Sequence, residues 1–280
     1  YGPVGVALLP LRRALGVPMM VSFYGIDASA FLRDAAHMAG YAAMWRECEC
    51  ISVLSRNMED ALAAAGCPRE KMRVHHLAVK TDEIVPTEEP AGAPPVRVVC
   101  VARLVGKKGI DTLLRAVAEA RDAGAPVELD IAGEGPLEAQ LKKESVALGL
   151  NGAVRFHGLL NRDAALALMR NAHIAALLSR TAQDGDAEGT PTALMEAGAL
   201  GLPCVSTIHA GIPEVVEHGQ TGLLVPENDA AAAARALKML ASDAAMRARL
   251  GAAAREKIVR EFSIEKVIAQ IECDYDNIKE

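Results

Sequence analysis

The sequence predicts an α/β protein whose doubly wound parallel sheets form two domains, the first of them incomplete. Short apolar runs alternate with longer helical patterns along the 280 residues. Runs that are apolar throughout are typical of strands covered by helices on both faces of a parallel sheet. A proline-rich, acidic break at residues 81–95 reads as a linker between domains. Three strand-like runs precede this break and six follow it, so the two parts are unequal.

The elements expected before the break are a helix over residues 4–15, strands at 19–23, 51–54 and 74–79, and helices at 36–47 and 57–65. Three strands are too few to match the second domain. Residues 1–80 are therefore expected to form the C-terminal part of a domain. The apolar helix at 4–15 needs a surface to pack against, and we expect an upstream segment to provide it.

The elements expected after the break alternate regularly. Strands are predicted at 96–101, 127–132, 154–156, 174–178, 204–206 and 222–225, and helices at 110–123, 137–148, 162–171, 192–200, 213–218 and 230–241. Residues 96–262 thus predict a complete doubly wound domain. The last stretch, 263–280, reads as a helix that packs back on the first domain.

Composition excludes several classes of protein. A net charge of −6 and an aromatic content of 3% argue against a general nucleic-acid binder, which needs a basic face and stacking platforms. The six cysteines lack the paired spacing of a zinc site and are expected to be reduced thiols of a cytosolic protein. No apolar run reaches the length of a membrane span.

Two glutamates eight positions apart, Glu188 and Glu196, are the most informative feature. Glu188 lies in a polar loop, whereas Glu196 lies in an apolar helix that we expect to begin with Thr190 as N-cap and Pro191 as first residue. A carboxylate among apolar residues needs a partner. Loop, helix start and carboxylates together predict a site for a polyhydroxylated, anionic ligand. The alternative is two ordinary solvated glutamates, and spacing alone does not decide between them.

Polar and glycine-rich segments follow the other strands of the second domain, at the sheet edge where such folds bind ligands. Arg103 and Lys108 follow the first strand; an arginine fork and a lysine point charge could neutralise a diphosphate, or form a solvated basic turn. Gly133 and Gly135 follow the second strand and allow close approach of a ligand. The third glycine of the dinucleotide fingerprint is absent. His157, after the third strand, is more often a structural residue than a base.

In order along residues 96–262, these motifs resemble the retaining GT-B glycosyltransferases of family 4. The resemblance rests on Ala102-Arg103-Leu104, Lys108-Gly109, Gly133-Glu134-Gly135-Pro136, Phe156-His157-Gly158, Glu188-Gly189-Thr190-Pro191, Glu196-Ala197, Gly211-Ile212-Pro213-Glu214 and Gly219-Gln220-Thr221-Gly222. The wording of residues 184–189 and 209–214 is similar to enzymes of colanic-acid and exopolysaccharide assembly. The resemblance implies two Rossmann-like domains and transfer of a hexose, with retention, to a saccharide or lipid-linked acceptor.

The resemblance also implies roles for the matched positions. Arg103 and Lys108 would bind the donor diphosphate, Glu196 the ribose hydroxyls, and Glu188 would face the sugar. The base would be framed by Gly133, Gly135, His157, Gly158 and Leu159, and the backbone of Gly189, Thr190, Pro191 and Thr192 would contact sugar and phosphate. A UDP-sugar is the expected donor. No metal or cofactor is expected, because the two cations and the helix dipole can stabilise the departing diphosphate.

Tyr24 is a departure from the family pattern. It stands in Phe23-Tyr24-Gly25, where family members often carry a histidine near the reacting carbon. A tyrosine can hydrogen-bond a sugar hydroxyl, but with a pKa of about 10 in model peptides it is a poor base at neutral pH. The expected catalytic set is therefore Glu188, Arg103, Lys108 and Tyr24.

Other functions remain open at this point. They are a truncated or non-catalytic nucleotide-sugar-binding module, and a GT-B relative such as a sugar-nucleotide epimerase or a phosphorylase. A phosphorylase needs a lysine for pyridoxal phosphate, and none stands out. The missing third glycine argues against a nicotinamide oxidoreductase. The expected location is the cytoplasm, with peripheral association at the inner membrane face as an option that only Arg12 and Arg13 favour.

Overall fold

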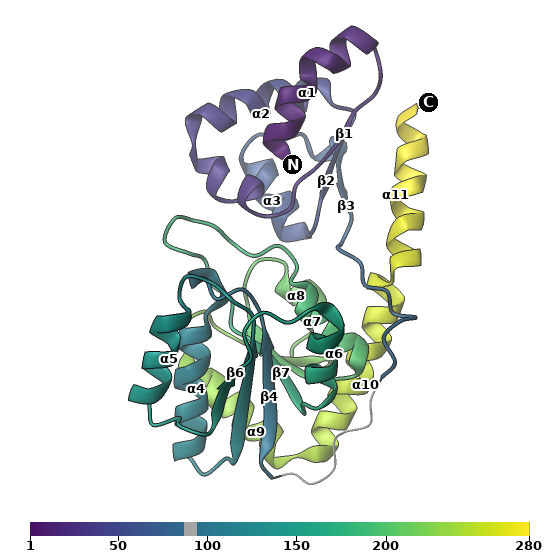
Figure 1. Cartoon of the computed structure of the whole chain (residues 1–280). Helices are drawn as coiled ribbons and strands as arrows, with labels where there is room; N and C mark the ends of the chain where they lie inside the picture. The colour runs from purple at the N-terminus through teal and green to yellow at the C-terminus, as the bar shows by residue number, and fades with distance from the viewer. Residues whose placement is uncertain (87–93, 280) are drawn as a thin grey trace.

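The computed structural model describes residues 1–86 and 94–279, so part of the predicted break at 81–95 lies outside the described residues. Two parallel sheets, of three and six strands, form two separate α/β domains. Figure 1 shows the smaller domain, in purple and blue, above the larger one, in teal and green. The predicted class, two parallel-sheet α/β domains with a smaller first sheet, is confirmed.

The first domain is a three-stranded sheet with the order β1-β2-β3, all parallel. Its elements are α1 (Gly2–Leu15), β1 (Met20–Ser22), η1 (Ile26–Ala28), η2 (Ala30–Arg33), α2 (Ala35–Glu47), β2 (Cys50–Val53), α3 (Arg56–Ala64), η3 (Arg69–Lys71) and β3 (Met72–Val74). The central strand β2 is buried along its whole length, as its apolar sequence predicts. Asp34 and Ser55 cap α2 and α3 through side-chain oxygens that accept backbone N–H groups.

The second domain contains the larger sheet, ordered β6-β5-β4-β7-β8-β9 and parallel throughout. Its elements are β4 (Val96–Val101), η4 (Gly106–Lys108), α4 (Ile110–Asp122), β5 (Val127–Ala132), α5 (Glu138–Ala147), β6 (Val154–Phe156), α6 (Arg162–Arg170), β7 (Ile174–Leu177), α7 (Thr192–Leu200), β8 (Cys204–Thr207), α8 (Ile212–Val215), β9 (Gly222–Val225), α9 (Ala230–Ser242) and α10 (Ala244–Phe262). Strand order reverses between β4 and β7. A doubly wound sheet binds ligands at this switch point.

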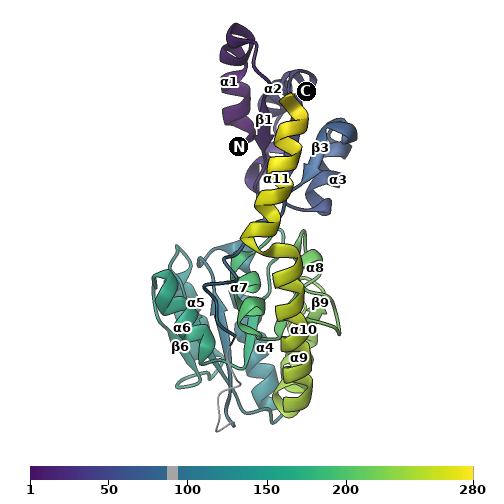
Figure 2. The same ribbon diagram turned by 90° about the vertical axis from the view of Figure 1, so that its right-hand side faces the viewer.

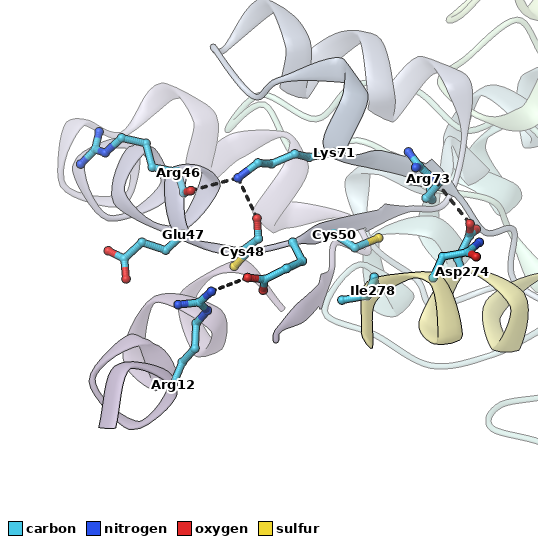
Figure 3. Close-up of a pocket in the computed structure, with 11 residues that line it drawn as sticks. Arg12, Arg46, Glu47, Cys48, Cys50, Lys71, Arg73, Asp274 and Ile278 are labelled. Carbon is cyan, nitrogen blue, oxygen red and sulfur yellow. Dashed lines mark hydrogen bonds and ion pairs between the residues drawn. The ribbon is translucent and has the colours of Figure 1, made fainter. Parts of the chain in front are cut away.

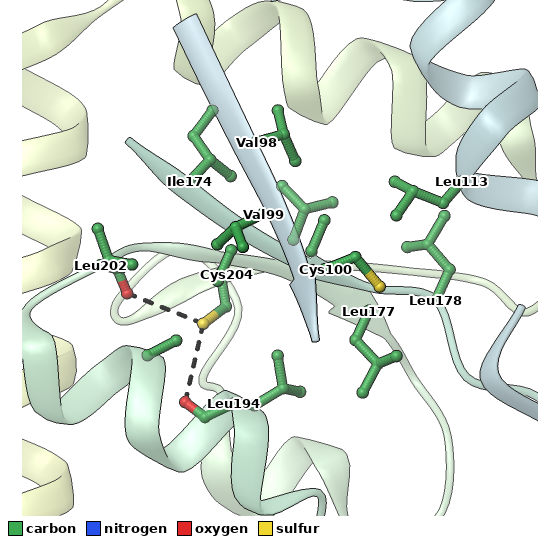
Figure 4. Packing of buried hydrophobic residues seen from close by; sticks show 14 of the residues in the cluster. Val98, Val99, Cys100, Leu113, Ile174, Leu177, Leu178, Leu194, Leu202 and Cys204 are labelled. Atoms are coloured by element: carbon green, nitrogen blue, oxygen red, sulfur yellow. Dashed lines mark hydrogen bonds between the residues drawn. The ribbon is translucent and has the colours of Figure 1, made fainter. Parts of the chain in front are cut away.

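The core of the second domain surrounds β4, which pairs with β5 on one side and β7 on the other. Val98, Val99 and Cys100 are at most 1% exposed, because helices cover both faces of the sheet. Figure 4 shows these residues packed against Leu113 of α4 and Ile174 of β7. Burial on two faces thus explains the apolar run at residues 98–101 of β4. This packing fixes the position of the loop that follows the strand.

One predicted element is wrong and one helix was missed. The strand expected at 74–79 ends at Val74. The N–H of His75 still donates to the carbonyl of Val53, but the chain then leaves the sheet, and Val79 forms an isolated bridge with Ser263. The nineteen-residue helix α10 was not predicted. It packs against α7, with Ile258 close to Gly198.

The chain returns to the first domain after α10. The backbone N–H of Val79 donates to the carbonyl of Phe262, and that of Ile264 donates to the carbonyl of Val79. From there α11 (Ile264–Lys279) runs beside β3, as Figures 1 and 2 show in yellow. The buried imidazole of His75 lies 2.9 Å from Asp274 of this helix and 3.0 Å from the hydroxyl of Ser52. One histidine therefore links α11 to the first sheet.

Candidate functional site

The loops that follow β4 to β8 gather at one edge of the second sheet, because all six strands are parallel. This edge faces the first domain, as Figure 1 shows. The prediction that these five segments share one edge is confirmed. Loop 178–191, after β7, and loop 102–109, after β4, lie on the two sides of the switch point.

Glu188 and Lys108 meet across the switch point. The Lys108 Nζ donates a hydrogen bond to the Glu188 carboxylate, and both side chains are little exposed (12% and 11%). The Ser179 hydroxyl lies 3.4 Å from the same carboxylate. Burial opposes ionisation of Glu188, but Lys108, with Lys107 and His209, holds the pKa of its carboxyl below the ordinary value. Glu188 is therefore an anion at neutral pH, paired but not fully covered.

A cavity of about 490 Å³ lies on the same sheet edge, at the ends of β4, β5 and β6. Arg103, Gly133, Gly135 and Leu159 line it, and its walls are largely backbone and apolar side chains. Arg103 is exposed, and its guanidinium makes no hydrogen bond or ion pair with any of the described residues. The structure thus brings four sequence-predicted residues to one cavity, with an unpaired guanidinium at its wall.

His157 and Gly158 border the cavity without lining it. The His157 Nε2 lies 2.7 Å from the Asp130 carboxylate, which Arg155 also binds at 2.8 Å. Burial opposes ionisation of Asp130, but Arg155 and His157 hold the pKa of its carboxyl below the ordinary value. The carbonyl of Gly158 accepts a bond from the N–H of Gly133 at 2.8 Å. Both residues shape the cavity wall, and the imidazole is held by a β5 side chain.

Glu196 lies on α7 behind the loop. Arg162, the first residue of α6, approaches its carboxylate at 3.3 Å and also binds Glu83 at 2.9 Å. The Glu196 side chain is 19% exposed, so it keeps a path to solvent. Glu188 and Glu196 therefore lie in different surroundings: Glu188 pairs with Lys108, and Glu196 pairs with Arg162.

The start of α7 differs from the prediction. Pro191 takes the N-cap position and Thr192 is the first helical residue, so Thr190 caps nothing. The Thr190 side chain is buried and its hydroxyl finds no partner among the described residues. The shift arises because the N–H groups of Leu194 and Met195 bond the carbonyl of Pro191. The N–H groups of the first turn remain available for an anion.

The first domain contacts this edge through Tyr24 and Ser29. A Cβ on Gly189 would lie 2.7 Å from the carbonyl oxygen of Tyr24, so only glycine fits there. The N–H of Ala187 donates to the Ser29 hydroxyl at 3.4 Å. The ring of Tyr24 is 39% exposed and packs at 5.1 Å on Tyr1. Tyr24 is thus next to the Glu188 loop.

Glu214 provides a second contact between the domains. Its Oε1 accepts hydrogen bonds from the backbone N–H groups of Arg56, at 2.8 Å, and Asn57, at 3.4 Å. These groups form the first turn of α3, where a carboxylate is stabilised by the helix dipole. The segment around Gly211 therefore docks one domain on the other.

A cavity of about 550 Å³ lies at the other end of the first domain, shown in Figure 3. Its cations are mostly occupied. Lys71 donates to the carbonyls of Trp45, Arg46 and Cys48, and Arg12 binds Glu49. We therefore interpret this cavity as a packing gap where α1, α2 and α11 meet, which we call the joint, and not as a ligand site.

The two arginines that favoured membrane association are paired. Arg12 binds Glu49, and Arg13 binds Glu47 at 2.5 Å. These ion pairs leave little free charge for lipid head groups. Within residues 1–86 and 94–279 no helix combines the length and the apolar character needed to cross a membrane.

Several residues of the site were not assigned from the sequence. Lys107 binds Asp186 at 2.9 Å, His209 accepts the N–H of Glu188 at 3.1 Å, and Arg162 pairs with Glu196. The sequence shows that His209 follows a strand at the binding edge, which was the one available signal. The partners themselves are 21 to 79 residues apart, too far for any spacing rule.

Comparison with known proteins identifies similar chains. Residues 83–257 match the family model described as glycosyl transferases group 1. The chain is 36% identical over 267 residues to the putative colanic acid biosynthesis glycosyltransferase WcaL of Escherichia coli K12, covering 94% of this chain and 66% of the relative. It is also 36% identical over 265 residues to the amylovoran biosynthesis glycosyltransferase AmsK of Erwinia amylovora, covering 94% and 65%. The chain thus spans about two thirds of the length of these relatives.

Solved structures with the same fold include Anabaena HepE in complex with UDP. The TM-score is 0.86, at 20% identity, over 99% of this chain and 77% of that chain. Sucrose-phosphate synthase from Thermosynechococcus elongatus has a TM-score of 0.83, at 21% identity, over 99% and 72%. These likenesses confirm the predicted GT-B fold.

Proposed function

The chain belongs to the family of glycosyl transferases group 1, and we propose that it transfers a hexose from a nucleotide diphosphate sugar to a saccharide or lipid-linked acceptor in polysaccharide biosynthesis. We propose further that transfer proceeds with retention and without a metal, and that the donor is a UDP-sugar. The relatives named above, which are described as glycosyltransferases of colanic acid and amylovoran biosynthesis, support this reaction class. They do not favour a sugar-nucleotide epimerase.

One observation carries the proposal: the Lys108–Glu188 pair lies at the switch point, on the same sheet edge as a cavity that is lined by Arg103, whose guanidinium is unpaired. A nucleotide diphosphate sugar has three parts that need different chemistry. Its base fits an apolar cavity, its diphosphate needs cations, and the hydroxyls of its sugar can donate hydrogen bonds to a carboxylate. The cavity, the two cations and Glu188 all lie on this sheet edge.

The role of each group follows from its contacts. Arg103 is free to grip a phosphate, and Lys108 can turn from Glu188 toward the same diphosphate. Glu188, an anion at neutral pH, would accept the hydroxyls of the sugar. Glu196, with its path to solvent, would accept the ribose hydroxyls.

Charge separation is the chemical problem that the site must solve. When the oxygen of an acceptor hydroxyl bonds the anomeric carbon, the bond from that carbon to the diphosphate oxygen breaks. The diphosphate leaves with the bonding electrons, gains negative charge and can then accept the proton of the hydroxyl. Arg103, Lys108 and the first N–H groups of α7 would stabilise that charge. The phenol of Tyr24 would contact the sugar from the first domain.

Partners and location follow the same reasoning and are proposals. The acceptor would lie between the domains, where Tyr24 and Ser29 meet loop 178–191. Nucleotide sugars and reduced thiols are cytoplasmic features, and the six cysteines are free.

Burial raises the pKa of Cys48 and Cys50 to about 11, so both thiols are expected to be unreactive at neutral pH.

We predict that a nucleotide diphosphate sugar stabilises the protein thermally in buffer that contains EDTA. Bound ligand stabilises the native state by about 2.7 kcal/mol at a hundredfold excess over Kd. A thermal-shift panel of UDP-, GDP- and ADP-sugars measures this directly. Glu196→Ala and Arg103→Ala are expected to abolish the shift that the wild type shows.

A matched control separates the donor site from general charge loss. Arg249→Ala removes an exposed arginine whose contact is a 3.4 Å bond to the carbonyl of Gly219, away from the candidate cavity. It should keep the full shift. Absence of a shift with every nucleotide sugar would overturn the donor-site assignment.

A further inference from the structure

His209 is buried beside Glu188 and has no role in the proposed reaction so far. It lies in the turn between β8 and α8 and is 4% exposed. Its Nε2 is 3.1 Å from the backbone nitrogen of Glu188, and its Nδ1 is 2.6 Å from the Glu227 carboxylate. Glu188 follows β7 and Glu227 follows β9, so the partners of His209 come from the strands on either side of β8.

The partners fix the protonation of this imidazole. A backbone N–H can only donate, so the Nε2 of His209 must carry a lone pair and accept from Glu188. The proton of the neutral ring then lies on Nδ1 and is donated to Glu227. A carboxylate that orients the far nitrogen of a histidine is a common way to hold one tautomer.

The same carboxylate also holds the other end of the loop. The second oxygen of Glu227 accepts the backbone N–H of Thr181 at 3.0 Å. Loop 178–191 is therefore tied near its start through Thr181 and near its end through Glu188, and both ties converge on Glu227. No regular secondary structure holds residues 182–190, so side-chain bonds position this loop, and His209 makes the one that reaches the Glu188 backbone nitrogen directly.

We propose that His209 is a positioning residue that holds Glu188 for the sugar of the donor, with Glu227 fixing the tautomer that this requires. This inference rests on the proposed function, because it assigns to Glu188 the contact with the sugar. The hydrogen bond of His209 goes to the Glu188 backbone. The groups proposed to bind the nucleotide, which are Arg103, the cavity and Glu196, contact neither His209 nor Glu227. Loss of His209 should therefore weaken recognition of the sugar and spare recognition of the nucleotide.

The test compares the Kd of a nucleotide diphosphate with that of its hexose derivative, for UDP, GDP and ADP, by calorimetry. In His209→Leu the preference for the hexose derivative is expected to fall about tenfold, while the Kd of the diphosphate alone stays within about twofold. His209→Gln should restore most of the preference, since its amide can accept from Glu188 and donate to Glu227. A merely structural role would weaken both ligands together.

Glu227→Ala gives the same test at a more exposed position, where folding is less at risk (29% against 3% side-chain exposure). It should lose the preference as His209→Leu does. If the wild type binds no nucleotide at all, the proposed function fails and this inference falls with it. If the wild type prefers the hexose derivative and His209→Leu keeps that preference, the positioning role is overturned while nucleotide binding stands. The same conclusion follows if the wild type binds nucleotides but has no preference for the hexose derivative.

Discussion

Replacing Lys108 by methionine is expected to lower kcat/KM for sugar transfer by about 100-fold or more. The substitution removes the one ammonium that pairs with Glu188 and one of two cations proposed to meet the departing diphosphate. Loss of a group that stabilises developing charge has effects of about this size. It also leaves Glu188 with a buried, poorly compensated carboxylate. Steady-state kinetics of the variant against the wild type measures the effect.

The pH dependence of kcat/KM in Lys108→Met provides an independent test of the same ion pair. In the wild type the pKa of Glu188 lies below its ordinary value, so the anion persists at neutral pH and its pairing energy is lost only as pH falls below the usual carboxyl range. Without Lys108, burial dominates and raises that pKa. The acidic limb of kcat/KM should therefore move to higher pH in Lys108→Met. Lys143→Met, on the exposed face of α5, is the control and should leave both rate and limb unchanged.

Replacing Gly133 by alanine is expected to lower the free energy of unfolding by about 3 kcal/mol and to abolish nucleotide binding. The backbone of Gly133 has φ 137°, and an added Cβ would lie 1.9 Å from the carbonyl oxygen of Ala102. Both are backbone constraints, so no side chain can move to relieve them. The end of β5 must separate from β4, which opens the cavity wall. Urea denaturation and the thermal-shift panel report the two effects.

Gly158 is the matched control for this prediction. It also has positive φ, at 68°, and borders the same cavity, but an added Cβ would meet no heavy atom within 4 Å. Gly158→Ala should therefore cost only the left-handed backbone strain of about 1 kcal/mol. Equal costs in the two variants would contradict the role assigned to close packing at Gly133.

Much of the architecture could be predicted because local signals and tertiary structure agree. Residues 98–101 form an unbroken apolar run within β4 that predicts burial on two faces, and the structure buries Val98, Val99 and Cys100. The parallel order then places the segments after each strand at one edge without further information. Arg103, Gly133, Gly135 and Leu159 could thus be assigned to one site from their positions after strands.

The misses have long-range causes. Residues 74–79 read as a strand by their apolar character, but His75 binds Asp274, 199 positions away, and Val79 pairs with Ser263. The choice between Thr190 and Pro191 as N-cap depends on which carbonyl the helix N–H groups reach. The Lys108–Glu188 pair joins residues 80 positions apart, so the sequence could supply both charges but not their contact.

The most direct test of the central claim is a crystal structure of the chain with the nucleotide diphosphate sugar that gives the largest thermal shift. We predict that the diphosphate lies at the carboxyl ends of β4 and β7, within hydrogen-bond distance of Arg103 and Lys108. The ribose hydroxyls should donate hydrogen bonds to the Glu196 carboxylate. A ligand bound elsewhere, for example in the joint around Arg46 and Lys71, would contradict it. So would a diphosphate at the switch point that contacts neither Arg103 nor Lys108.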